Sequence, residues 1–205
     1  MTTDDPSAYP GSAVLRNKLD LIDAEQLARM ERLSVTQRAA EGIPSGGFDL
    51  AHLSAIHRHL FQDIHEWAGD VRTVEIAKGG HQFQFRRFIE RGMQDIYQRL
   101  ERANFLRGLV GRVEFAAAAG RIMGDVNYVH PFREGNGRAQ LFYLERLAEQ
   151  ASHPMDLARL NPRRWIEASR ASHGGDYEMM AAEIGRCLPG LAGGYGRSPR
   201  RSRRR

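Results

Sequence analysis

The stretch HPFREGNGR, residues 130–138, places a histidine, an acidic residue and a basic residue around two glycines and an asparagine. Gly135 and Gly137 carry no side chain that would keep phosphate oxygens away from the backbone. A loop of this kind that opens a helix presents free backbone N–H groups to an anion, and the helix dipole favours the negative charge. The stretch therefore predicts an anion site, and a glycine-rich turn between two helices is the simpler alternative.

The polar side chains of the stretch favour the anion site over the plain turn. Asn136 can donate to a phosphate oxygen and Arg138 can bind further phosphates, whereas Glu134 is a hard oxygen ligand suited to Mg²⁺. A histidine ordinarily titrates near neutrality, so His130 can take the proton of an attacking hydroxyl. These parts meet the needs of nucleotidyl or phosphoryl transfer, which depends mostly on positioning and charge neutralisation.

Helical patterns surround the stretch and must position it. Asp23 and Asp49 are suited to cap helices, the first of which is either one helix or two divided at a Ser-Val-Thr step. Segment 112–126, RVEFAAAAGRIMGDV, is apolar nearly all round and predicts a buried central helix. Asn161 as a cap and Pro162 at the first helical position predict a later helix. Apolar residues at helical spacing predict the inner faces of the others: Leu27, Met30 and Leu33; Leu50, Leu53, Ile56, Leu60 and Ile64; Ile89, Met93, Ile96 and Leu100; Leu141, Leu144 and Ala148.

Segment 72–85, RTVEIAKGGHQFQF, changes to a period of two. Gly79 and Gly80 offer a two-residue turn between its two arms, which predicts a short β-hairpin. The alternating apolar residues are Val74 and Ile76 before the turn and Phe83 and Phe85 after it. In a helical chain such a hairpin exposes two edges unless another segment pairs with them.

Charge and composition narrow the classes of function. The net charge is +5, but residues 197–205 hold six arginines and no acids, and removing those six charges leaves −1. The body therefore offers no basic face for nucleic acid, and the tail is interpreted as a solvated segment with nucleic-acid contact as the alternative. No stretch resembles a membrane span or a signal peptide, so we expect a cytoplasmic protein.

Cysteine and histidine usage gives no metal-cluster signal. Cys187 is alone and is expected to pack at the end of the last helix. Four histidines cluster in or after the segment that Asp49 caps, without the spacing of a zinc protease, and are expected in packing and surface roles. They are His52, His57, His59 and His65.

HPFREGNGR is similar to HxFx(D/E)GNGRxxR, the signature of the Fic family, and LFQDIHEWAGDVRTVEIAKGG resembles the family's segment leading into the flap, a hairpin over the active site. The resemblance extends over residues 9–188. It implies an all-α fold with a short β-hairpin flap, and transfer of AMP from ATP to a protein hydroxyl with Mg²⁺ and release of pyrophosphate. From its residues the chain is expected to divide into an extended arm (1–19) with Tyr9, Val14 and Leu15 as anchors onto a core, a catalytic domain (20–188) and a flexible tail (189–205).

The resemblance assigns roles by position. His130 becomes the base, Glu134 the Mg²⁺ ligand and Phe132 a core anchor for the loop. The expected nucleotide contacts are Lys78, Gly79, Gly135, Asn136, Gly137 and Arg138. The flap is expected to dock an extended target segment by β-augmentation through Val74, Ile76, Lys78, His81 and Phe83.

The chain departs from the family pattern at the second arginine of the signature, where Leu141 stands. That arginine normally helps to hold the γ-phosphate, so a degenerate domain that binds nucleotide or a partner without efficient transfer is the alternative function. Gly137 stands where kinase-like relatives carry lysine, which favours AMP transfer over transfer of the γ-phosphate.

Control of the activity is expected from outside the chain. The inhibitory pattern (S/T)xxxE(G/N) fails at Glu41-Gly42, because Gln37 occupies the hydroxyl position, and the C-terminal segment offers Asp176 instead of a glutamate. The chain thus resembles Fic toxins and secreted effector domains that a separate small antitoxin silences. The toxins act on type II topoisomerases and the secreted domains on GTPases of a host cell. This chain is therefore expected to act on one of these two target classes, either in the cytoplasm or after secretion into another cell.

Overall fold

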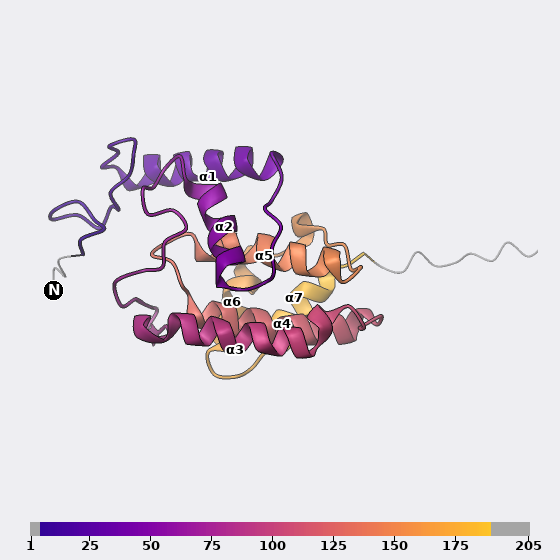
Figure 1. Ribbon diagram of the computed structural model, residues 1–205. Coiled ribbons are helices and arrows are strands. Elements are labelled where there is room, and N and C mark those ends of the chain that lie inside the picture. The colour runs from indigo at the N-terminus through magenta and orange to yellow at the C-terminus, as the bar shows by residue number, and fades with distance from the viewer. Residues whose placement is uncertain (1–4, 190–205) are drawn as a thin grey trace, which may run out of the picture.

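The computed structural model describes residues 5–189, in which seven α-helices and one two-stranded hairpin form the fold (Figure 1). The prediction of an all-α domain with a short hairpin is confirmed. The elements are α1 (Ala24–Ala40), α2 (Leu50–Phe61), β1 (Ala77–Lys78), β2 (His81–Gln82), α3 (Ile89–Arg102), α4 (Arg112–Val129), α5 (Asn136–Gln150), α6 (Pro162–Ser172) and α7 (Glu178–Cys187). Short 3₁₀ turns cover Arg86–Phe88, Asn104–Leu106 and Leu157–Arg159.

Helix α4 is the centre of the fold and contacts α3, α5, α6 and α7. Phe115 and Val126 have no exposed surface, and the buried side chains lie around most of the helix, as its apolar sequence predicts. At Gly120 an added Cβ would lie 2.9 Å from the backbone nitrogen of Ala181, so the missing side chain lets α7 approach closely. The buried α4 ends at the first residue of the motif stretch, and its packing therefore fixes where that stretch begins.

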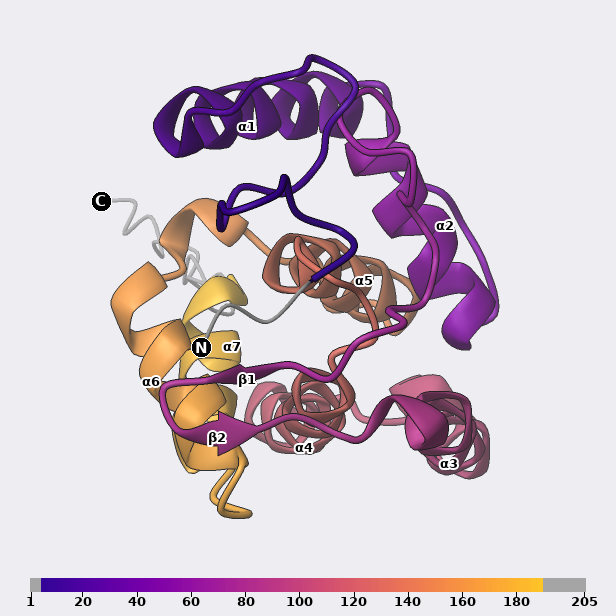
Figure 2. The same ribbon diagram turned by 90° about the vertical axis from the view of Figure 1, so that its left-hand side faces the viewer.

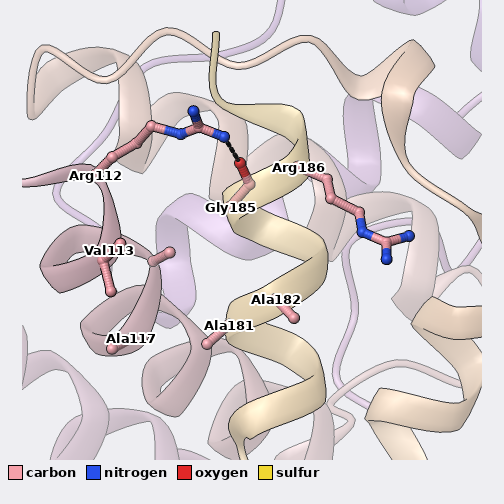
Figure 3. A pocket seen from close by; sticks show the side chains of 8 residues that line it. Arg112, Val113, Ala117, Ala181, Ala182, Gly185 and Arg186 are labelled. Carbon is pink, nitrogen blue, oxygen red and sulfur yellow. Dashed lines mark hydrogen bonds between the residues drawn. The ribbon is translucent and has the colours of Figure 1, made fainter. Parts of the chain in front are cut away.

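A shallow groove of about 640 Å³ runs between the first turns of α4 and the last turns of α7 (Figure 3). Four alanines, two from each helix, line it, and the Arg112 side chain reaches from α4 to the Gly185 carbonyl of α7. Val113, at its edge, is 82% exposed. Because an α-helix rises about 1.5 Å per residue, the groove lies about 25 Å from the other end of α4, where the motif stretch starts.

Helices α1 and α2 begin at the caps that the sequence predicts. The Asp23 side chain accepts from the backbone N–H of Gln26, and that of Asp49 accepts from the N–H of His52. Helix α1 runs unbroken through the Ser-Val-Thr step, and the Thr36 hydroxyl donates to the Arg32 carbonyl within the helix.

The predicted inner face of α1 is wrong at two of its three residues. Leu27 is buried, but Met30 is 37% exposed and Leu33 is 55% exposed. The second buried residue of this helix is Glu31, four positions after Leu27. A carboxylate therefore lies where an apolar side chain would be expected, and its partners belong to the candidate site.

The hairpin between α2 and α3 has strands of two residues each, joined at Gly79 and Gly80, which both have positive φ. We call residues 74–85 the flap. Figure 2 shows it passing the end of α4 and reaching towards α6. All four strand residues are exposed, and the sheet has no third strand among the described residues.

The N-terminal arm, which was expected to be extended, folds back on itself in its described part. Ala8 and Leu15 form an antiparallel bridge and are both 8% exposed. Tyr9 and Val14, which were also expected to anchor the arm, are half-buried. The arm then joins the body where the Lys18 N–H donates to the Ile64 carbonyl at 2.8 Å.

The end of the described chain agrees with the sequence where it can be compared. Cys187 is fully buried at the end of α7, as predicted. Most of the predicted tail, residues 190–205, lies outside the described residues. Within residues 5–189 no helix is both long and apolar enough to cross a membrane.

Candidate active site

The motif loop, residues 130–138, connects α4 to α5 through a left-handed turn. Gly135 caps α5 with φ of 79°. A Cβ at this glycine would lie 2.6 Å from two ring atoms of Phe61 and 3.1 Å from Nε2 of His57. Gly135 also supplies no capping side chain, so the first N–H groups of α5 stay available to an anion. The turn thus has the shape that the sequence predicts for an anion site.

The side chain of His57 packs against this turn and hydrogen-bonds to it. Its Nδ1 accepts from the Gly69 N–H at 2.9 Å, and its Nε2 then donates to the Glu134 carbonyl, also at 2.9 Å. Its ring stacks on Phe132 with a centroid distance of 4.0 Å. Burial is the main cause that lowers the pKa of His57, to about 4. The neutral imidazole therefore acts as a fixed support for the loop, a packing role of the kind expected for this histidine.

Asn136 holds the loop together from inside. Its side-chain oxygen accepts from the Phe132 N–H at 2.9 Å, and its amide donates to the Phe132 carbonyl at 2.7 Å. Asn136 is 2% exposed, and Phe132 has no exposed surface. Phe132 is thus the core anchor that the resemblance implies. The phosphate contact expected for Asn136 stays a prediction, because the described bonds of its side chain all serve the loop.

His130 ends α4 in a left-handed conformation with φ of 48°. Its Nδ1 lies 3.1 Å from the Asn127 carbonyl, which can only accept, so Nδ1 carries the proton and Nε2 keeps its lone pair. Phe83 of the flap stacks on the imidazole at 3.7 Å between centroids. Burial is the main cause that lowers the pKa of His130, to about 3, and the charge of Arg72 acts in the same direction. The imidazole is therefore neutral and has one free acceptor nitrogen, as a general base requires.

Arg138 is already paired with a carboxylate from α1. Its guanidinium donates to Glu31 at 2.7 Å, lies 3.7 Å from Glu134 and rests 4.5 Å over the Phe61 ring. The other oxygen of Glu31 lies 2.8 Å from Nε2 of His65. Burial raises the pKa of Glu31, but the hydrogen bond from His65 and the charge and hydrogen bond of Arg138 outweigh it and leave the pKa lowered. A phosphate that binds Arg138 would have to share the guanidinium with Glu31.

Glu134, the magnesium ligand that the resemblance implies, lies directly before the start of α5. One of its oxygens accepts from the Gly135 N–H at 3.0 Å, and its side chain is 51% exposed beside the start of α5. No cluster of three metal-ligating side chains forms among residues 5–189. Mg²⁺ commonly binds through one or two carboxylates together with substrate phosphates. A single half-exposed carboxylate at Glu134 is compatible with this mode of binding.

The predicted flap residues fall into three groups by exposure. Lys78, Gly79 and His81 are exposed at the tip, and Val74 and Ile76 are half-buried on the first arm. Phe83 is only 6% exposed, because it lies beneath the hairpin against His130. The outer strands can therefore meet a target segment, whereas the Phe83 ring covers the imidazole.

His173, at the end of α6, borders the same space and was missed by the sequence analysis. Its Nδ1 lies 2.9 Å from the Ser169 carbonyl, and its ring lies 5.1 Å from that of Phe83 and 5.6 Å from that of His81. Its Nε2 is buried without a partner among the described residues. No pattern in the sequence signalled this residue, which reaches the flap only through the tertiary fold.

Arg72 was also missed, although the sequence contains a signal. It shares the parity of Val74 and Ile76 in the alternating segment, which places a charged residue on the inner face of the hairpin arm. Arg72 is 4% exposed. A charge on an inner face needs several partners, and that requirement was the available clue.

The fold and the loop define a class of protein: a helical domain in which a hairpin covers a neutral histidine beside a helix start whose first N–H groups have no side-chain cap. Comparison with known proteins makes the class specific. The family model described as "Fic/DOC family" matches residues 47–148. This chain belongs to the Fic/DOC family, as the sequence predicts.

The curated relatives carry related names. The chain is 39% identical over 185 residues to "Probable protein adenylyltransferase y4lH" of Sinorhizobium fredii, covering 90% of this chain and 96% of the relative. It is 38% identical over 189 residues to "Protein adenylyltransferase VbhT" of Bartonella schoenbuchensis, covering 91% of this chain but only 39% of that longer relative.

Solved structures show the same fold with nucleotides bound. The BepC effector protein of Bartonella tribocorum, solved with AMPPNP, has a TM-score of 0.82 and 26% identity, covering 92% of this chain and 99% of that one. The N-terminal Fic domain of a Bartonella quintana effector, solved with ADP, has a TM-score of 0.81 and 28% identity, covering 90% of this chain and 94% of that one.

Proposed function

We propose that this chain is a protein adenylyltransferase, which transfers AMP from ATP to a hydroxyl side chain of a protein and releases pyrophosphate. The observation that carries the proposal is the state of His130: a fixed Nδ1–H, a free Nε2 and a position beside the helix start that can hold phosphates. The names of the relatives and the nucleotides in related structures support it.

The reaction uses the residues of the motif loop in separate roles. The hydroxyl oxygen of the target attacks the α-phosphorus of ATP while Nε2 of His130 takes the hydroxyl proton. The bond from the α-phosphorus to the bridging oxygen breaks, and pyrophosphate leaves. The N–H groups at the start of α5 and the guanidinium of Arg138 bind phosphate oxygens and neutralise their charge.

Nucleotide binding adjusts the base. A histidine with a pKa of about 3 is a weak base at neutral pH. The negative charge of bound phosphates favours the imidazolium and raises the pKa of His130 towards the working pH. His130 thus gains basicity when a donor nucleotide is in place.

Mg²⁺ is the proposed metal cofactor, and Glu134 is its proposed ligand. When bound, the ion neutralises negative charge on the phosphates. Glu134 directs one oxygen to the Gly135 N–H and is half exposed, so its second oxygen can serve a metal.

The proposed substrate is an extended segment of another protein. Both flap strands are exposed, and among the described residues each pairs only with the other, so each has a free edge for an added strand. We further propose that the chain is a toxin or an effector domain restrained by a separate small antitoxin, because its sequence lacks the inhibitory pattern of self-silenced Fic proteins. Two of the related structures are titled as VirB-translocated effector proteins of Bartonella, which supports the effector role.

A second candidate is a degenerate domain that binds nucleotide or a partner without efficient transfer. The observation that favours it is Leu141, which is half-buried against the core where the family signature has an arginine. Arg138 is then the one arginine of the signature left for the phosphates.

The test uses purified chain, Mg²⁺ and bacterial lysate, with ATP labelled on either the α- or the γ-phosphate. AMP transfer leaves α-label and no γ-label on a protein band, and His130→Ala abolishes the band while affinity for a non-hydrolysable ATP analogue stays unchanged. His59→Ala, a change of the same kind away from the loop, is the control. Absence of α-label with intact analogue binding would support the degenerate domain.

A paired measurement addresses the metal. Calorimetry with the analogue, with and without Mg²⁺, should show that the ion strengthens binding to the wild type and not to Glu134→Ala. Glu90→Ala, at an exposed glutamate on α3, should behave as the wild type. Equal Mg²⁺ dependence in Glu134→Ala would remove the metal role of this residue.

A further inference from the structure

The guanidinium of Arg72 joins the end of α4 to both arms of the flap. Its side chain has no exposed surface. Nε donates to the His130 carbonyl at 2.8 Å, and Nη1 donates to the Val74 carbonyl, also at 2.8 Å. Nη2 donates to the Gln84 carbonyl. Val74 precedes β1 and Gln84 follows β2, so one side chain holds the two arms and the residue that carries the imidazole.

The backbone at the same place strengthens this junction. The Arg72 N–H donates to the Pro131 carbonyl at 2.8 Å, and the Gln84 N–H donates to the Tyr128 carbonyl at 3.0 Å. The segment that leads into the flap is therefore bonded to the motif loop, and the second arm of the flap is bonded to the end of α4. Its connection does not depend on the two strands alone.

Backbone carbonyls, and not a buried carboxylate, stabilise the charge of Arg72. Among residues 5–189, Glu75 is the carboxylate that pairs with it, 3.4 Å away and 42% exposed. The planar fork of an arginine can reach three carbonyls in different directions, whereas a lysine ammonium is a compact charge on a flexible stem. Movement of the flap away from α4 would leave buried charged donors without partners, which is unfavourable.

The junction controls what covers the base. Phe83 lies directly before Gln84, and its ring stacks on His130 with planes 17° apart. Holding the Gln84 carbonyl therefore also holds Phe83 over the imidazole. The bond from Arg72 to the Gln84 carbonyl thus fixes the distance between the flap and Nε2 of His130.

We infer that Arg72 is a positioning residue, which fixes the flap relative to His130 so that a target segment docked on the flap presents its hydroxyl to Nε2. This inference rests on the proposed AMP transfer for its functional part. Arg72 contacts the backbone of His130 and not its ring, so it acts through the geometry of the flap.

The test compares Arg72→Lys with Arg86→Lys. Both changes keep the charge, and Arg86 is the matched control because it lies at the end of the same flap with its side chain 58% exposed. The first readout is the NMR signal of the His130 Cε1–H, assigned by its loss in His130→Ala. Stacking on Phe83 displaces this signal upfield, so Arg72→Lys should move it downfield towards the signals of exposed histidines, and Arg86→Lys should leave it in place.

The second readout is function. Arg72→Lys should reduce transfer of α-label in lysate by about a hundredfold, the size expected for a displacement of about 1 Å at the reacting atoms. Affinity for the non-hydrolysable ATP analogue should stay within about twofold of wild type, because the motif loop keeps its own support from His57 and Asn136. A purely structural role would instead lower analogue affinity and transfer together.

Several outcomes would overturn the inference. An unchanged His130 signal in folded Arg72→Lys would show that Arg72 does not set the flap, and a displaced signal with unchanged transfer would show that its position is irrelevant. If the wild type transfers no label, the proposed function fails while the NMR comparison still decides the structural claim. Should Arg72→Lys fail to fold, the Arg72 Nε–H signal of the wild type must exchange slowly with water, and rapid exchange would refute the junction.

Discussion

Replacing Gly135 by alanine perturbs the motif loop at the one residue where both backbone and packing require glycine. An alanine with φ of 79° costs about 1–2 kcal/mol in the left-handed region. Its methyl would lie 2.6 Å from the Phe61 ring, and overpacking of this kind costs about 1–3 kcal/mol more. The sum of about 2–5 kcal/mol corresponds to a fall in melting temperature of about 4–20 °C for a domain of this size.

Gly137 provides a matched control two residues later. Its φ lies outside the left-handed range, and an added Cβ meets nothing within 4 Å. Gly137→Ala should therefore keep or slightly raise the melting temperature, by the helix preference of up to about 1 kcal/mol. Its methyl would nevertheless occupy the open space at the start of α5, where phosphate oxygens are expected, so affinity for an ATP analogue should fall.

Thermal melts and calorimetry with the analogue in Mg²⁺ measure both variants. The expected pattern is a large loss of stability in Gly135→Ala and a loss of binding without a loss of stability in Gly137→Ala. A Gly135→Ala protein that melts and binds as the wild type does would refute the loop geometry. Normal binding by Gly137→Ala would refute the phosphate position.

Two further predictions concern Leu141 and His57. Leu141→Arg, three residues from Arg138 on the same face of α5, should raise analogue affinity about tenfold through a charge-assisted contact and lower stability by about 1 kcal/mol for the lost apolar burial; unchanged affinity in a stable variant, by calorimetry, would contradict it. Burial lowers the pKa of His57 from 6.5 to about 4, so the folded protein binds the proton of this residue more weakly than the unfolded chain does. The contribution of neutral His57 to the free energy of unfolding is therefore complete above about pH 6.5 and is lost as the pH falls towards 4. Denaturant unfolding between pH 7 and 4 should show a loss of about 3 kcal/mol from this residue, smaller in His57→Gln and unchanged in His81→Gln; equal slopes in all three proteins would exclude His57 as the cause.

Local signals predicted the helices well because their causes are local. Asp49 caps α2, and Asn161 and Pro162 begin α6, through bonds and dihedral preferences that extend over three residues. The interruption considered for α1 does not occur, because Ser34 donates to the Leu60 carbonyl of α2, a contact that no local pattern contains.

The candidate site was predicted less completely, because its supports come from distant segments. His130 and Gly135 lie in one recognisable stretch. The pair between Arg138 and Glu31 joins residues 107 positions apart, and the bond from Arg72 to His130 spans 58. Apolar periodicity placed Met30 and Leu33 on the buried face of α1. It cannot indicate that the carboxylate of Glu31 will be buried there instead, because the arginine that pairs with Glu31 comes from another helix.

If a nucleotide phosphate binds Arg138 as proposed, the chain of contacts through Glu31 links nucleotide binding thermodynamically to the N-terminal arm. Arg138 bonds to Glu31, Glu31 bonds to His65, and the other ring nitrogen of His65 lies 3.3 Å from the Arg16 carbonyl of the arm. Any phosphate that draws Arg138 away weakens a contact beneath the arm, and any protein that holds the arm in place strengthens it. By linkage, a partner bound to the arm changes nucleotide affinity by the same factor by which nucleotide changes the affinity of that partner.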